Sequence, residues 1–135
     1  MCIRDRSPRT ATSVTAWWRY AGSALDWSGA DWDTAYDAVR AALVGTFAGV
    51  HSLALQQTIH AMAAAAMDAV PEVAELRISC PNKHHFEVDL SPFGMANGGE
   101  VFVAADRPYG LIQATVGRAG AAAEPRAWTA VPAFA

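Results

Sequence analysis

The sequence has few cysteines, and they are not arranged to bind a metal or to form a disulfide framework. Only Cys2 and Cys80 occur among 135 residues, and neither has a partner at the spacing of a zinc site. His51 and His60 also lack ligand spacing. We therefore expect no metal and no other cofactor bound through cysteine, and we expect Cys80 to be a small buried hydrophobic residue.

Clusters of basic residues and long apolar runs are absent as well. The formal net charge is -3, and nucleic-acid-binding proteins concentrate Lys and Arg on one face, so nucleic acid is not an expected partner. The longest apolar runs, such as residues 61–66, are far shorter than a membrane span, and residues 1–8 do not form a signal peptide. Without a C-terminal peroxisomal signal, the sequence predicts a soluble, cytoplasmic protein of bacterial type with no membrane partner.

The first six residues, MCIRDR, look like the in-frame translation of a sequencing-library adapter. Such segments are set aside before the fold is considered. On this interpretation residues 1–6 are an artefact and the chain is a fragment of a longer protein. The alternative is a short disordered N-terminus.

The hydrophobic content of 53% suits one globular domain, and its first part has a strand pattern followed by two helical patterns. Residues 13–20 alternate, and one face carries Val14, Ala16, Trp18 and Tyr20. Asp31 can cap a helix whose apolar positions are Trp32, Tyr36, Val39, Leu43, Phe47 and Val50. Ser52 can cap a second helix, closed by Pro71, with a stripe of Leu55, Ile59, Met62, Ala66 and Val70. The two helices are expected to form an antiparallel pair.

The second part of the chain returns to a period of two. Residues 75–80 and 84–90 alternate on either side of Pro81-Asn82-Lys83, which predicts two antiparallel strands joined by a tight turn. A brief strand at 101–103 and a last strand at 111–116 follow, and the Ala- and Pro-rich residues 119–135 are expected to be disordered. The predicted fold class is α+β, an antiparallel sheet with both helices packed on one face.

One stretch carries a family resemblance. Residues 80–94, CPNKHHFEVDLSPFG, resemble the signature of the uricase family, and so do TSVTA at 12–16 and DRPYGLI at 106–112. These pieces stand in the family's order and spacing, which a chance motif match would not give. The resemblance implies a tunnelling fold of ββααββ type over residues 7–118, with its first strand missing. The strand at 13–20 then leaves an unpaired sheet edge, as expected if the chain is cut just upstream.

The resemblance also implies an activity. Uricases convert urate, O2 and water to 5-hydroxyisourate and hydrogen peroxide as homotetramers, without metal or organic cofactor. Deprotonated urate is itself the reductant, so the protein needs only to bind it, remove protons and hold O2 or water above the ring. The fragment alone is expected to be inactive.

Two matched residues begin the second helix. Gln56 matches the family's urate-binding glutamine, and Leu55 matches a residue whose backbone N–H contacts urate. A first helical turn has free backbone donors, which independently suits an anionic ligand. Without the resemblance, Gln56 would be interpreted as a solvated helix residue.

The other matched residues lie in and near the PNKHHF segment. Asn82 matches the asparagine that holds O2 or water, and His84 matches a histidine of the proton relay. From the residues alone, Asn82 suits a turn and His84 a core or rim histidine, while His85 has no assigned role. Counting back from Ala11 puts Pro8 where the family has a urate-clamping arginine. Arg9 replaces that arginine only if the backbone shifts by one residue.

The family's Lys-Thr pair and its stacking aromatic residue belong to sequence upstream of this chain. Two alternatives stay open. A pterin-handling enzyme of the same fold would need an acidic anchor or a histidine zinc cluster, and the PNKHHF context argues against it. A degenerate domain that only assembles with partners would not be an enzyme.

Overall fold

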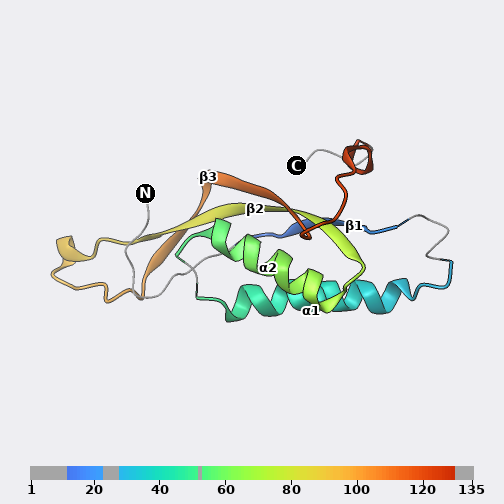
Figure 1. Cartoon of the computed structure of the whole chain (residues 1–135). Coiled ribbons are helices and arrows are strands. Elements are labelled where there is room, and N and C mark those ends of the chain that lie inside the picture. Colours follow the sequence, from blue (N-terminus) through green and yellow to red (C-terminus); the bar gives the residue numbers. More distant parts are fainter. Residues whose placement is uncertain (1–11, 23–27, 52, 130–135) are drawn as a thin grey trace.

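The computed structural model describes residues 12–22, 28–51 and 53–129, and the backbone only at 106–109. In these ranges an antiparallel sheet is covered on one face by two helices (Figure 1). The strands are β1 (Thr15–Tyr20), β2 (Val73–Glu87) and β3 (Phe102–Gly117), in the spatial order β1-β2-β3. The predicted α+β class is confirmed.

The helices α1 (Trp32–Gly49) and α2 (Leu55–Ala69) run antiparallel beneath the sheet. As predicted, Asp31 caps α1, where its carboxylate accepts hydrogen bonds from the backbone N–H of Thr34 at 3.1 Å and from its hydroxyl at 2.7 Å. These bonds hold the pKa of Asp31 below its ordinary value.

The start of α2 differs from the prediction. Ser52 lies outside the described residues, and the N-cap position is occupied by Ala54, which provides no side-chain hydrogen bond. The helix nevertheless forms because its apolar stripe is buried against the sheet, and tertiary packing supplies most helical stability in proteins. The predicted stripe is confirmed in full, and its members are Leu55, Ile59, Met62, Ala66 and Val70.

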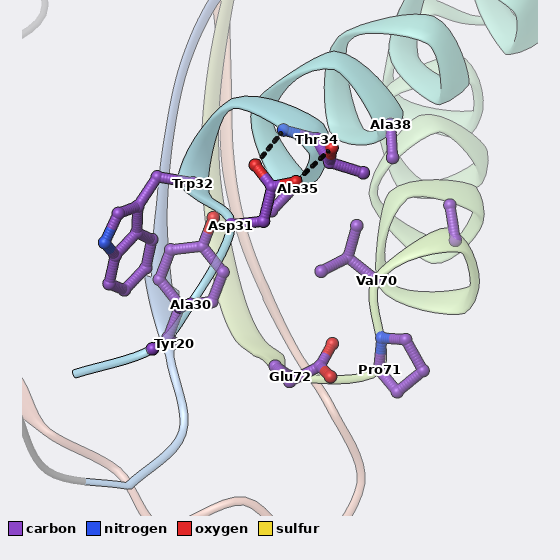
Figure 2. Close-up of a pocket in the computed structure, with 12 residues that line it drawn as sticks. Tyr20, Ala30, Asp31, Trp32, Thr34, Ala35, Ala38, Val70, Pro71 and Glu72 are labelled. Atoms are coloured by element: carbon purple, nitrogen blue, oxygen red, sulfur yellow. Dashed lines mark hydrogen bonds between the residues drawn. The ribbon is translucent and has the colours of Figure 1, made fainter. Parts of the chain in front are cut away.

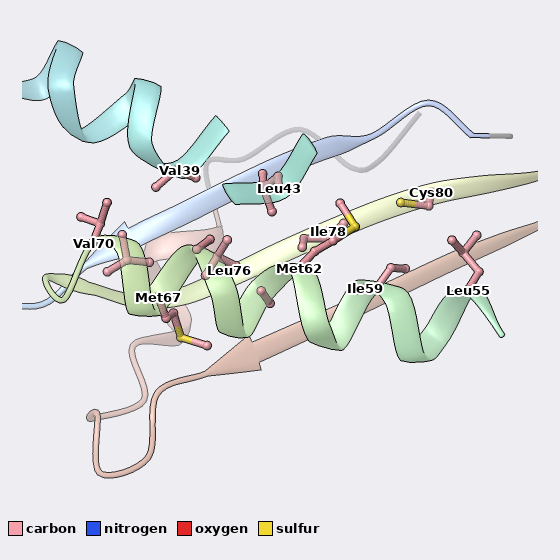
Figure 3. Packing of buried hydrophobic residues seen from close by; sticks show 13 residues of the cluster. Val39, Leu43, Leu55, Ile59, Met62, Met67, Val70, Leu76, Ile78 and Cys80 are labelled. Atoms are coloured by element: carbon pink, nitrogen blue, oxygen red, sulfur yellow. The ribbon is translucent and has the colours of Figure 1, made fainter. Parts of the chain in front are cut away.

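The core lies between α2 and the first half of β2 (Figure 3). Leu76, Ile78 and Cys80 are fully buried on the helix side of β2, as the alternation predicts. From the other strands, Ala16, Trp18 and Tyr20 of β1 pack against this cluster, and so do Ile112, Ala114 and Val116 of β3. This end of the sheet is therefore fixed from one side by the helices and along both edges of β2 by pairing.

The predicted turn at Pro81-Asn82-Lys83 is wrong. β2 is a single strand that continues through this segment, and Pro81 pairs with Leu111 and Asn82 with Gly110 of β3. Pro81 is tolerated in the central strand because the β1–β2 ladder ends at Thr15 and Ser79, so the N–H that proline lacks is not required there. The two predicted strands at 101–103 and 111–116 likewise correspond to one strand, β3, which begins at Phe102.

Two short 3-10 helices complete the described structure, Ser91–Phe93 and Pro125–Trp128. The second lies inside the segment expected to be disordered, and there the structure differs from the expectation. Trp128 is buried, its Nε1–H donates to Glu75 Oε2 at 3.2 Å, and the guanidinium of Arg77 lies 4.6 Å from its ring centroid. An aromatic side chain with two such contacts orders a segment whose composition alone favours disorder.

Candidate functional site

The first turn of α2 carries two of the candidate residues. The first carbonyl group that accepts a helical hydrogen bond is that of the N-cap residue Ala54. It accepts from the N–H groups of Gln57 at 3.0 Å and Thr58 at 3.3 Å. The N–H groups of Leu55 and Gln56 come before these first helical donors and have no acceptor within the helix. Leu55 is buried and its side chain anchors the turn in the core, while the side chain of Gln56 is exposed. The turn thus combines a fixed backbone with an amide side chain that can reach a ligand.

Asn82 and His84 lie on β2 where its pairing with β3 is irregular. Asn82 pairs with Gly110 and His84 pairs with Ala105, so a single residue of β2, Lys83, lies opposite residues 106–109 of β3. The extra residues belong to β3, which is therefore the strand that bends here, and bulges are frequent next to active sites. Both side chains are half-buried, and the rings of His84 and Phe86 lie 6.0 Å apart, on one face as expected.

The fold brings the start of α2 close to the middle of β2. Leu55 and Cys80 belong to the same buried cluster and lie at the same end of it (Figure 3). Asn82 follows Cys80 by two residues and therefore lies on the same face of the strand. His84 is a further two residues along, about 7 Å at the rise of a strand. The first turn of α2 and the part of β2 that follows Cys80 therefore lie at the same end of the core, whereas Arg9 lies outside the described residues.

The polar side chains at this end are available to a ligand. Among the described residues, neither Gln56 nor Asn82 nor His84 has a side-chain hydrogen bond to another residue. A carboxamide offers two donors and an acceptor, and an imidazole offers one of each when neutral. Such groups suit a flat heterocycle with alternating N–H and C=O groups.

In the part of the chain that the structure describes, no three His, Cys, Asp or Glu side chains are grouped to hold a metal ion. Cys80, the nearest thiol, is fully buried as predicted. Burial raises its pKa, and a hydrogen bond with Thr12 opposes this shift. The thiol is therefore a packing residue rather than an ionised ligand or nucleophile.

Sequence reasoning missed Thr12 as a residue of this region. Its Oγ1 donates to the carbonyl oxygen of Pro81 at 2.7 Å across 69 residues of sequence. The signal that could have identified it is the strand register, because Thr15 pairs with Ser79 and the antiparallel count then places Thr12 opposite Asn82.

A pocket of about 550 Å³ lies elsewhere, between the N-terminus of α1 and the C-terminus of α2 (Figure 2). Its lining includes Tyr20, Asp31, Trp32, Val70 and Glu72. Because α2 begins at Leu55 and ends at Ala69, this pocket is at the opposite end of the helix from the candidate residues. It contains none of them.

Among the described residues, no helix has the length and apolarity required to cross a bilayer. The fold defines the class of this chain as an α+β domain in which the start of α2 lies at the same end of the core as the irregular pairing of β2 with β3.

Comparisons with known proteins identify the particular family. The uricase family model matches residues 4–113, and the chain therefore belongs to the uricase family. It is 49% identical over 124 residues to the uricase of Arthrobacter globiformis, and the aligned region covers 92% of this chain and 39% of that protein. The uricase of Oryctolagus cuniculus is 36% identical over 118 residues, 86% of this chain and 38% of the relative.

The solved structures agree with this assignment. The crystal structure of uricase from Arthrobacter globiformis matches with a TM-score of 0.80 at 50% identity, covering 88% of this chain and 40% of that one. The tunnelling fold that the resemblance implied is thereby confirmed for this chain. The chain spans about two fifths of the length of the curated relatives that it matches.

Proposed function

We propose that the full-length protein containing this chain is a urate oxidase that converts urate, O2 and water to 5-hydroxyisourate and hydrogen peroxide. The observation that carries the proposal is the convergence of the first turn of α2 with Asn82 of β2, in a chain of the uricase family. The reaction balances without a further reagent, because urate supplies two electrons to O2 and water supplies the added oxygen.

Gln56 and Leu55 are proposed to bind the edge of urate. The exposed carboxamide of Gln56 can donate to one ring group and accept from its neighbour. The N–H of Leu55 is one of the free donors at the helix start, where the dipole also favours an anion. Urate is an anion at neutral pH, so both features favour it. Arg9 would add a charged contact only if the backbone shift considered above occurs.

Asn82 and His84 are proposed as the catalytic residues. An amide in the middle of the strand can hold O2 or water against the ring, and an imidazole can accept and return a proton. Asn82 and His84 are two residues apart in β2, so a single face of the strand can present both side chains to one ligand. Neither role requires a metal or an organic cofactor, because urate itself is oxidised.

We further propose that the full-length protein acts as a cytoplasmic homotetramer. β1 is an edge strand within the described sheet, and an edge of this kind is a template for pairing with another strand. The chain spans about two fifths of its relatives, and the general base that the family resemblance puts upstream is not part of it. The isolated chain is therefore expected to be inactive, since general acid–base groups are commonly worth about two to four orders of magnitude.

The test is an assay of the full-length protein and of the isolated chain, each purified without added metal or cofactor. We expect the full-length protein to consume urate and O2 and to release hydrogen peroxide in equal amounts, with no effect of a chelator. We expect no turnover from the isolated chain. A full-length protein without urate-dependent peroxide would contradict the proposal, and bound zinc with pterin turnover would favour the pterin-handling alternative.

A further inference from the structure

Thr12 makes a contact that the proposed reaction does not yet use. Its hydroxyl donates to the carbonyl oxygen of Pro81 at 2.7 Å, in a half-buried position. A second acceptor, the carbonyl oxygen of Ser13, lies farther away at 3.1 Å, and the Cys80 thiol is a third neighbour of the hydroxyl. A hydroxyl has a single proton, so the shorter contact to Pro81 is the one that it satisfies best.

The contact stands where regular pairing of β1 and β2 stops. The register runs from Arg19 and Glu75 to Thr15 and Ser79, and its continuation would put Thr12 opposite Asn82. Pro81 cannot donate to such a continuation because it has no N–H. Its carbonyl still requires a donor, and the side chain of Thr12 supplies that donor in place of the backbone of β1.

The carbonyl that Thr12 binds belongs to the peptide group between Pro81 and Asn82. That group is planar, so a hydrogen bond to its oxygen also orients the N–H and the Cα of Asn82. On the opposite edge of β2, Asn82 pairs with Gly110 of β3, which is adjacent in sequence to the irregular stretch at 106–109. Bulges loosen pairing locally. Thr12 therefore holds Asn82 from the side of β1 at the point where β3 departs from regular register.

We infer that Thr12 is a positioning residue for Asn82, which fixes the orientation of the Asn82 carboxamide through the Pro81–Asn82 peptide. This inference rests on the proposed function, in which Asn82 acts on O2 or water. Thr12 itself touches no reacting atom. Its removal is expected to affect the step that uses Asn82 and to leave urate binding through Gln56 unchanged.

The experiment compares Thr12→Val, Thr12→Ser and Thr15→Val in the full-length protein. Valine keeps the shape of threonine without its hydroxyl, and serine keeps the hydroxyl. Thr15 is the matched control because it is the same residue type three positions after Thr12, at the start of β1, with an exposed side chain. The measurements are kcat, the binding of xanthine as a non-reactive purine probe, and the thermal midpoint.

We expect Thr12→Val to lower kcat by roughly three- to tenfold, the usual effect of one lost hydrogen bond, with xanthine affinity within about twofold. We expect Thr12→Ser to restore most of kcat and Thr15→Val to match the parent. Unchanged kcat in Thr12→Val would overturn the inference, and so would a loss of kcat and xanthine binding in proportion to a lowered thermal midpoint.

Two further results complete the test. If Thr12→Val does not fold, Thr12→Ala provides the same comparison, and recovery of kcat by serine alone would again support the positioning role. If the parent protein itself produces no peroxide from urate, the proposed function fails and the inference fails with it. An active parent with an unaffected Thr12→Val variant would refute the inference alone.

Discussion

The two halves of β2 differ sharply although they belong to one strand. In the first half, Leu76 and Ile78 are fully buried between α2 and the neighbouring strands. Beyond the bulge, β2 and β3 extend past the helices as an arm, defined here as residues 86–103 (Figure 1). In the arm, Phe93 is 73% exposed and Met95 is 56% exposed. Burial in this sheet therefore depends on the helical layer, which ends near Cys80.

The candidate site lies at the boundary between these regions. Leu55 and Cys80 mark the end of the core, and Asn82 is the first polar residue beyond it on the same face. A site placed there has rigid support on one side and an open approach on the other, which suits a bound ligand. Apolar side chains grouped on a surface often mark contacts with other chains or segments, and the arm has this character.

The largest effect that separates the two regions is expected from a core substitution. Met62 is fully buried in α2, so Met62→Ala should lower the free energy of unfolding by about 2–5 kcal/mol through lost transfer energy and a cavity. Phe93→Ala in the arm should change it by less than about 0.5 kcal/mol, because Phe93 is already exposed. Urea unfolding of both variants measures this difference. Equal losses would mean that the arm is packed and that the comparison is wrong.

A smaller effect is expected at Trp128, on the face of the sheet that the helices do not cover. Trp128→Ala removes the hydrogen bond to Glu75 and the contact with Arg77, for a loss of about 1–3 kcal/mol. Trp128→Phe keeps the ring over Arg77 and should lose only about 1 kcal/mol. Urea unfolding again measures both. If Trp128→Ala were as stable as the parent, the C-terminal segment would not contribute to the sheet.

The smallest effect is expected at the cap of α1. The bonds from Thr34 hold the pKa of Asp31 below its ordinary value of 3.8. A lowered folded-state pKa contributes stability that is complete above the unfolded value and is lost as pH falls through the folded value. Asp31→Ala should therefore lower the thermal midpoint slightly at neutral pH and have a smaller effect at low pH. A loss of the same size at both pH values would contradict this role of the carboxylate.

Much of the fold could be predicted from periodicity alone. The stripe of α2 from Leu55 to Val70 and the alternation from Leu76 to Cys80 both follow from burial on one face, and both are confirmed. The continuity of β2 could not be predicted, because Pro81-Asn82-Lys83 has the composition of a turn. Proline is acceptable at position 81 because the pairing of β2 with β1 has already ended at Ser79, while the pairing with β3 continues.

The candidate site was less accessible to physical reasoning. An exposed Gln56 and an Asn82 after proline have no pattern that distinguishes them from a solvated residue and a turn residue, and the family resemblance alone indicated them. Thr12 was missed because its partner lies 69 residues away, and only a known register connects the two. The burial of Trp128 depends on Glu75 and Arg77, which are also far away in sequence, 53 residues in the case of Glu75.

The central claim is that Gln56 and Asn82, from the two elements that meet at the end of the core, serve one reaction in different ways. It is tested most directly by the KM for urate, kcat and the affinity for xanthine in full-length Gln56→Ala and Asn82→Ala. Gln56 would contact urate in the ground and transition states alike, so Gln56→Ala should chiefly raise KM and weaken xanthine binding. Asn82 would act only along the reaction path, so Asn82→Ala should lower kcat and leave xanthine affinity nearly intact. If Asn82→Ala instead abolished xanthine binding in a folded protein, Asn82 would be a substrate ligand or a structural residue, and the account would be contradicted.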